Sequence, residues 1–198
     1  LISCGGTVPE KSARPAHSPG MRMERFTVRR QTGSSRFIEI AGDSAEWTAG
    51  DRVEMDSVTL TFYRDNLTFL NLAGRAAHAR MGAGEPGAIT LSGAYGRLYY
   101  GGRIRCETMQ VLFEEGVWRA EGSVEFQRPP ISLTAASAYG PLSMDEIYAG
   151  DARIRTDESA SSGDRMILRP AQHLLFFQGN ARYVSDTITL QSDTLALR

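Results

Sequence analysis

The chain has 198 residues, of which 41% are hydrophobic and 23% are charged, a composition typical of a single globular domain. Its 22 basic and 23 acidic residues leave a net charge of -1, so no overall field attracts nucleic acid or an anionic membrane. The two cysteines, Cys4 and Cys106, fit no metal-binding or disulfide pattern. We therefore expect no nucleic-acid partner, no metal and no cofactor.

The first four residues, Leu1 to Cys4, are similar to a bacterial lipobox, in which the cysteine carries a lipid after signal-peptide cleavage. The next residues, 5–20, are rich in Gly, Pro, Ser and charge, as a flexible tether is. We expect residues 1–3 to be a signal-peptide remnant, 4–22 to be the lipidated cysteine and its tether, and 23–198 to be the folded domain. A frayed terminus with a chance cysteine is the alternative.

From Met23 onward the apolar residues alternate with a period of two, and no helical periodicity persists, so the domain is predicted to be all-β. Predicted strands cover residues 37–41, 53–63, 67–74, 88–95, 102–113, 116–126, 131–138, 147–156, 165–169 and 174–190. Long loops are expected at 82–87 and 159–163. Such alternation gives a sheet with one dry and one wet face, which must enclose an apolar interior.

An internal repeat supports a stack of β-hairpins. The segment that begins at Gly122 is repeated at Gly179, 57 positions later, with Phe126 matched by Tyr183 and Leu133 by Leu190. Chance agreement among alternating strands is the other explanation.

Several segments resemble the lipopolysaccharide-export protein LptC, namely 37–45, 58–63, 89–113 and 122–138, and the segment 176–197 is similar to the hairpin unit of OstA/LptA proteins. The resemblance implies a twisted β-jellyroll, open on one side, that carries lipopolysaccharide acyl chains without catalysis. It also implies an inner-membrane ABC-type extractor (LptF/LptG-like) and a periplasmic LptA-like protein as partners. A lipobox-like segment in place of the family's transmembrane helix departs from the pattern. We expect a periplasmic protein anchored to the inner rather than the outer membrane.

The predicted groove uses the apolar residues that alternate onto one strand face, although the same residues could fill a closed core. They are Ile89, Leu91, Ile104, Val111, Phe113, Val124, Phe126, Ile131, Leu133, Phe177, Tyr183, Ile188 and Leu190. The segment 188–197 would be the edge to which a partner adds its own strand, through Ile188, Thr189, Leu190, Gln191, Leu195 and Leu197. Cys106 is expected to be a small buried hydrophobe.

Two other classes of protein compete with the carrier. An enzyme is disfavoured because His17, His78 and His173 belong to no catalytic or metal-binding pattern and the acidic residues are scattered. A structural or carbohydrate-binding β-sandwich lipoprotein would have a filled interior and a surface aromatic patch, for which Tyr95, Tyr99 and Tyr100 are candidates.

Overall fold

The protein is one antiparallel sheet of consecutive strands, as seen in a computed structural model that describes residues 20–31, 36–48, 51–65, 67–82, 85–99 and 101–197. The strands are β1 (Arg22–Gln31), β2 (Arg36–Trp47), β3 (Arg52–Arg64), β4 (Leu67–Gly82), β5 (Glu85–Leu98), β6 (Arg103–Leu112), β7 (Val117–Arg128), β8 (Ile131–Pro141), β9 (Ile147–Arg155), β10 (Ser159–Arg169), β11 (Leu174–Ser185) and β12 (Thr189–Leu197). A single 3-10 turn, η1 (Pro170–Gln172), is the other regular element of the described residues.

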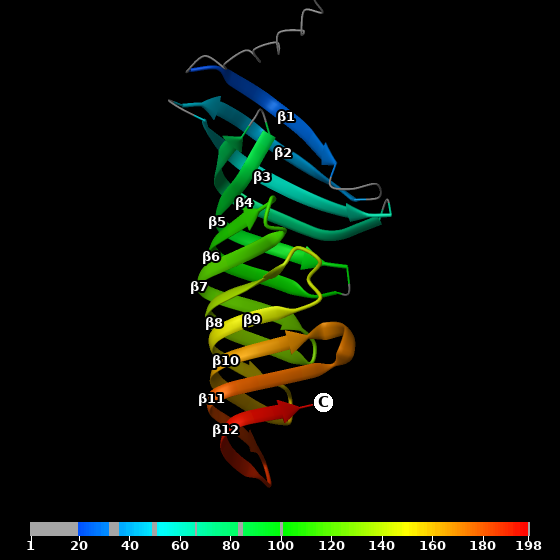
Figure 1. Ribbon diagram of the computed structural model, residues 1–198, viewed down its shortest axis with the longest axis vertical. Helices are drawn as coiled ribbons and strands as arrows, with labels where there is room; N and C mark the ends of the chain where they lie inside the picture. Colours follow the sequence, from blue (N-terminus) through cyan, green and yellow to red (C-terminus); the bar gives the residue numbers. More distant parts are fainter. Residues whose placement is uncertain are drawn as a thin grey trace, which may run out of the picture.

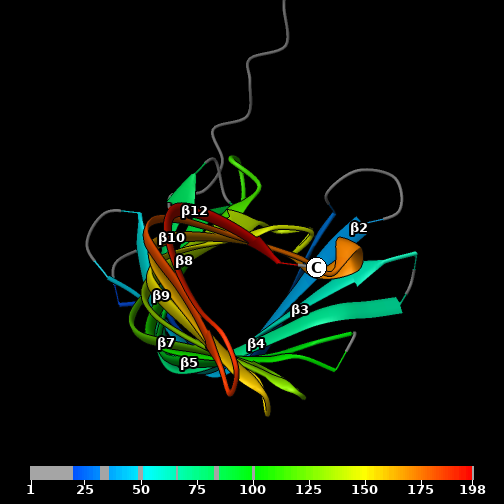
Figure 2. The same ribbon diagram turned by 90° about the horizontal axis from the view of Figure 1, so that it is seen from below.

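Each strand pairs with its neighbours in the sequence, so β1 and β12 have a partner on one side only and the sheet does not close. The strands stack along the long axis from β1 to β12 (Figure 1) and wrap around a common interior, with the ends of β3 and β4 extending outward from the later strands (Figure 2). The predicted all-β jellyroll of stacked hairpins, open on one side, is confirmed.

A regular bend gives the sheet its curvature. Every odd-numbered strand has a residue in the left-handed region near its middle, which interrupts the ladder and turns the strand. These residues are Arg25, Ser57, Gly93, Ser123, Asp151 and Asn180. Each strand therefore contributes one half to each of the two walls that face the interior.

The repeat predicted at Gly122 and Gly179 has a counterpart in this bend. Both glycines have φ +73, and the residues after them, Ser123 and Asn180, both have φ +47. A Cβ at Gly122 would lie 2.5 Å from Glu107 Oε2 and one at Gly179 would lie 2.6 Å from Asp164 Oδ2. Glycine is required at both positions for the backbone conformation and for the space.

Two rows of inward-facing side chains cross all twelve strands, because residues paired across neighbouring strands point to the same side of the sheet. The first inner row is Val28, Ile40, Leu60, Leu72, Gly96, Ile104, Phe126, Leu133, Ile154, Ser161, Tyr183 and Leu190. The second inner row, on the other wall, is Met23, Ala45, Met55, Ala77, Leu91, Met109, Ala120, Ala138, Ala149, Met166, Phe177 and Leu195.

The two rows differ in side-chain size. The first contains mostly branched and aromatic residues, whereas the second consists of alanine, methionine, leucine and phenylalanine. Methionine is flexible and adapts to irregular space, so the second wall is the more adaptable of the two.

The structure corrects two sequence-based expectations about loops. Residues 159–163 were expected to be a loop, but they form the start of β10 and pair with both β9 and β11. Ser161 is buried in the first inner row, where its small side chain faces the interior. The expected loop at 82–87 is also shorter, since β4 ends at Gly82 and β5 begins at Glu85.

Strand β1 was not predicted. Phe26 belongs to the apolar core and Met23 packs against it. The two residues are three positions apart, whereas residues on one face of a regular strand are an even number of positions apart. The left-handed conformation of Arg25 shifts the alternation by one residue, which removes the period-two signal from the sequence.

Gly96 tests the packing of the first inner row. A Cβ at this position would lie 2.6 Å from Leu72 Cδ2 and 2.8 Å from Ile104 Cγ2, so we expect Gly96→Ala to lower the free energy of unfolding by about 1–3 kcal/mol. A Cβ at Gly87, also in β5, meets its nearest atom at 3.7 Å, so Gly87→Ala should change it by less than about 0.5 kcal/mol. Urea denaturation of both variants provides the comparison, and equal values would contradict the tight row.

Candidate functional site

The interior between the two walls brings together most of the residues predicted to line a groove. Nine of them are buried: Ile89, Leu91, Ile104, Val111, Phe113, Val124, Phe126, Leu133 and Phe177. Ile131, at the start of β8, is partly buried and packs against this core. In this state the middle of the interior is filled by its own side chains.

Burial falls toward the two ends of the first inner row. Leu60 is 0% exposed and Leu133 is 1% exposed, whereas Val28 on β1 is 42% exposed and Leu190 on β12 is 48% exposed. Tyr183 on β11 is half-buried, and Ile188, which lies in the turn before β12, is 53% exposed. The apolar lining therefore continues to both terminal strands, where no further strand of the described residues covers it.

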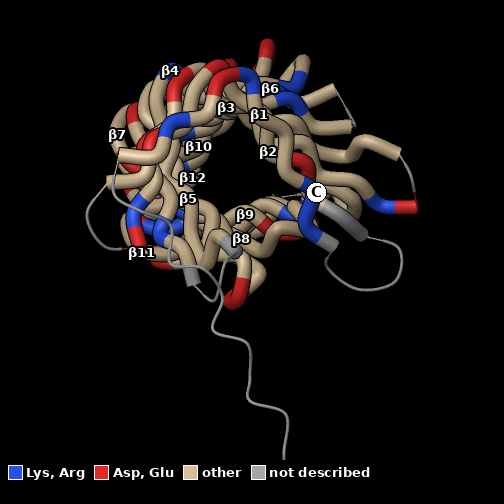
Figure 3. The backbone as a smooth tube through the Cα atoms, turned by 90° about the horizontal axis from the view of Figure 1, so that it is seen from above, with Lys and Arg blue, Asp and Glu red and all other residues tan. Residues whose placement is uncertain are grey.

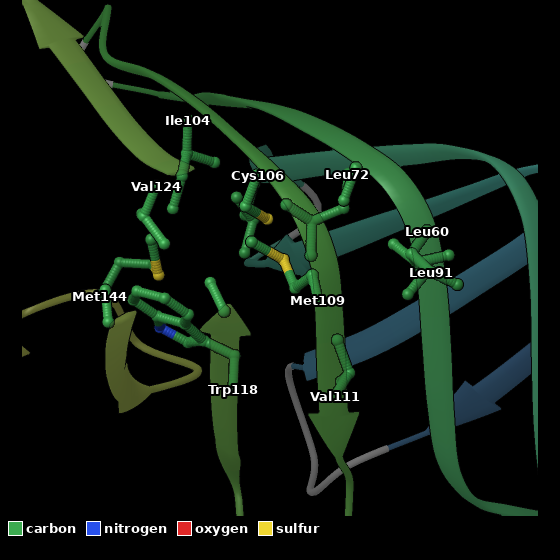
Figure 4. Close-up of a cluster of buried hydrophobic side chains, with 14 of the residues drawn as sticks. Leu60, Leu72, Leu91, Ile104, Cys106, Met109, Val111, Trp118, Val124 and Met144 are labelled. Carbon is green, nitrogen blue, oxygen red and sulfur yellow. The ribbon is translucent and has the colours of Figure 1, made fainter. Parts of the chain in front are cut away.

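Met144 fills the interior from the loop between β8 and β9. Its side chain is 3% exposed and lies beside Val124 and Trp118 (Figure 4). Trp118 is 1% exposed, and its indole N–H has no hydrogen-bond partner among the described residues. An unpaired buried N–H costs about 1–3 kcal/mol, so this part of the interior contains a donor available to an acceptor.

The free edge of β12 presents main-chain donors that can be identified from the register. The Ser185 N–H donates to the Ile188 carbonyl at 2.9 Å, and hydrogen-bonded pairs alternate along an antiparallel ladder. The Tyr183–Leu190 pair is therefore bonded, and the N–H groups of Thr189 and Gln191 point away from β11. The predicted docking edge is thus a strand with outward donors, although it begins at Thr189 rather than at Ile188.

Cys106 lies in the interior wall and is 4% exposed. Burial raises the pKa of its thiol from 9.0 to about 12 by desolvating the thiolate. The stability that the neutral thiol provides is fully present below pH 9 and is lost as the pH rises through the folded-state pKa. Cys4 lies outside the described residues, as does almost all of the expected tether.

We expect Cys106 to be unreactive in the folded protein. In a Cys4→Ser chain at pH 8, a thiol reagent should label Cys106 at least about 100-fold more slowly than in urea, since the thiolate is the reactive form and burial restricts access. The free energy of unfolding should also decrease between pH 9 and pH 11 relative to Cys106→Ala. Rapid labelling under native conditions would show that the interior opens to solvent at this position.

An outer groove on β8 to β12 was not predicted. Tyr139 and Tyr148 face each other across β8 and β9 and stack with ring centroids 4.9 Å apart and an interplanar angle of 11°. They line a groove of about 760 Å³ together with Ile167 and Phe176. The signal lay in the register, which places these residues, far apart in the sequence, in one outward row.

A polar cluster borders this groove. The Tyr148 hydroxyl donates to Glu146 at 2.5 Å, and Arg169 Nε donates to the same carboxylate at 2.6 Å. The hydrogen bond from Tyr148, assisted by Arg169, lowers the pKa of Glu146 and in turn raises the pKa of Tyr148. The cluster holds the Tyr148 ring at the groove.

Tyr95 and Tyr99, the other candidate aromatic residues, are 57% and 65% exposed, and Tyr100 lies outside the described residues. The described residues contain no group of three His, Cys, Asp or Glu side chains that could hold a metal. No helix in the same ranges is long and apolar enough to cross a membrane.

Several solved structures are similar to this chain, and one of them covers most of its length. It is LptH from Pseudomonas aeruginosa, described as the LptA homologous periplasmic component of the conserved lipopolysaccharide transport device. The match has 10% sequence identity and a TM-score of 0.31, and it covers 81% of this chain and 94% of LptH. No protein-family model and no curated protein matches. The function is therefore argued from the geometry of this chain.

Proposed function

We propose that this protein is a non-catalytic periplasmic carrier that binds lipopolysaccharide acyl chains in its apolar interior. The observation that carries the proposal is the pair of inner rows, which cross all twelve strands of an unclosed sheet, and the first of which becomes exposed at both ends. A closed sandwich has no need of an apolar lining that continues to unpaired terminal strands. A row of this kind provides continuous contact for a long hydrocarbon chain.

The energetics favour transfer through such an interior. Burying one methylene group stabilises it by about 0.8 kcal/mol relative to water, so a long acyl chain needs apolar cover throughout its passage. Because the interior is filled, the cargo must displace flexible side chains. Four methionines of the second inner row and Met144 of the β8–β9 loop are suited to this role; the four are Met23, Met55, Met109 and Met166.

We further propose that the protein is one unit of a bridge joined edge to edge. The outward donors of Thr189 and Gln191 on β12 would pair with the first strand of a periplasmic LptA-like protein, extending the sheet and aligning the two interiors. The free edge of β1 would remain for the inner-membrane ABC-type extractor (LptF/LptG-like). A lipid on Cys4 would keep the chain at the membrane, the inner membrane in this arrangement.

In-cell photo-crosslinking tests the cargo. A photoreactive residue is placed in turn at Phe113, Phe126 and Leu133, which are 7%, 2% and 1% exposed. The control position is Glu125, which lies on the outer face of β7 next to Phe126. We expect crosslinks to lipopolysaccharide at the three inward positions and none at Glu125. Crosslinks only at Glu125, or none in a chain that is folded by circular dichroism, would overturn the proposal.

The second candidate is a carbohydrate-binding β-sandwich lipoprotein, which the filled interior and the stacked Tyr139–Tyr148 pair favour. Aromatic faces exposed beside a groove are suited to the apolar faces of sugars. This candidate predicts that Tyr139→Ala weakens binding to an oligosaccharide and that the interior positions give no crosslink. The carrier predicts that Tyr139→Ala leaves oligosaccharide binding unchanged and that the interior positions crosslink to lipopolysaccharide.

A further inference from the structure

One outer wall of the sheet collects six arginines that are dispersed in the sequence. Arg97 and Arg103 are direct partners across β5 and β6, and Arg105 follows on the same face of β6. Arg153 and Arg155 on β9 and Arg182 on β11 lie in the same two outward rows. We call these six residues the arginine face. At about 4.8 Å per strand, it extends roughly 29 Å from β5 to β11.

The charges of this face have few acidic neighbours among the described residues. All six arginines are exposed, and within the described part of the chain none of their side chains forms an ion pair or a hydrogen bond. Glu125 is the one acidic residue in the two rows between β5 and β11. The remaining 16 basic and 22 acidic residues carry a formal charge of -6, so the net charge of -1 conceals a strong separation.

Exposed apolar side chains lie at one border of the arginine face. Leu67 at the start of β4 is 72% exposed, Tyr99 in the turn after β5 is 65% exposed, and Tyr95 is 57% exposed and pairs directly with Arg105. A hydrogen bond of 2.9 Å from the Tyr99 N–H to the Phe69 carbonyl holds the two strand ends together. Tyrosine and leucine next to arginine are typical of protein surfaces that enter the boundary between water and lipid.

From this juxtaposition we propose that the arginine face lies on the surface of an anionic phospholipid bilayer. The guanidinium groups are distributed over a wide wall instead of converging on one point, which matches the dispersed phosphates of a membrane surface. Figure 3 shows basic segments, in blue, grouped on the wall beside the labels β5 and β11. Leu67 and Tyr99 would enter the headgroup region, so that electrostatic and apolar contacts combine. The inference is independent of the cargo and of the Cys4 lipid.

Vesicle sedimentation tests the proposal with the full 198-residue chain carrying Cys4→Ser, so that no acyl anchor contributes. The vesicles contain phosphatidylcholine alone or phosphatidylcholine with about 30% phosphatidylglycerol, and the buffer is at physiological salt concentration. We expect binding to the anionic vesicles only. Each surface arginine contributes about fivefold in affinity, so the triple variant Arg97→Gln, Arg103→Gln, Arg105→Gln should bind about 100-fold more weakly.

Two controls keep the result specific. The variant Arg22→Gln, Arg80→Gln, Arg165→Gln removes the same charge from exposed positions outside the face and should bind like the parent. The variant Arg97→Lys, Arg103→Lys, Arg105→Lys keeps the charge and should retain most of the binding. The proposal is overturned if the parent does not bind anionic vesicles, if both glutamine variants lose binding equally, or if duplex DNA binds more tightly at the same salt concentration.

Discussion

Replacing Thr189 and Gln191 with proline is expected to abolish docking of a partner strand while leaving the fold intact. Both N–H groups point away from β11, so their loss removes no bond of the intrachain ladder. Each proline removes one main-chain donor, worth about 1 kcal/mol, and its ring obstructs the approaching strand. Affinity for an LptA-like jellyroll protein should decrease by at least about 30-fold, measured by titration calorimetry with purified proteins.

Leu190→Pro is the matched control for this edge. The Leu190 N–H faces Tyr183 within the ladder, so its removal should release β12 from β11 as well as weaken docking. Hydrogen exchange in β11 and β12 would distinguish the two effects, since the amides of Tyr183 and Ala181 should lose protection only in Leu190→Pro. If Thr189→Pro and Gln191→Pro bind like the parent while folded, β12 is not the docking edge.

The sequence predicted the architecture because the clearest alternation lies in the central strands. Ile104, Phe126 and Leu133 alternate with polar residues, and they form one stretch of the first inner row. What the alternation alone could not predict was where each strand bends. A single left-handed residue such as Arg25 shifts the pattern by one position, and this shift concealed β1.

The outer surface was less predictable than the interior for a related reason. Tyr139 and Tyr148, or Arg97 and Arg103, become neighbours only through the strand register. Composition gave a net charge of -1 and no expectation of an electrostatic partner, because an average over the chain cannot show a separation between walls. Register depends on bulges such as that between Glu121 and Val124, which one sequence does not specify.

Comparing Phe177→Ala with Phe176→Ala tests which face of β11 points to the interior. Phe177 is 0% exposed in the second inner row, whereas Phe176, the adjacent residue of the same type, is 39% exposed on the outer face. We expect Phe177→Ala to lower the free energy of unfolding by about 3–5 kcal/mol, through lost burial and the cavity that remains. Phe176→Ala should cost less than about 1 kcal/mol, because much of that side chain remains in water.

Urea denaturation measures the free energy of unfolding that each variant loses, and the comparison tests the register of β11. Because a slip of one residue exchanges the two faces of a strand, equal losses, or the larger loss at Phe176, would place β11 one residue out of register. Adding lipopolysaccharide extends the test to function, since a ligand that binds only the folded state raises its stability. If the cargo contacts the second inner row, it should stabilise Phe176→Ala as much as the parent and Phe177→Ala by a different amount. Equal stabilisation of all three proteins would place the cargo away from Phe177.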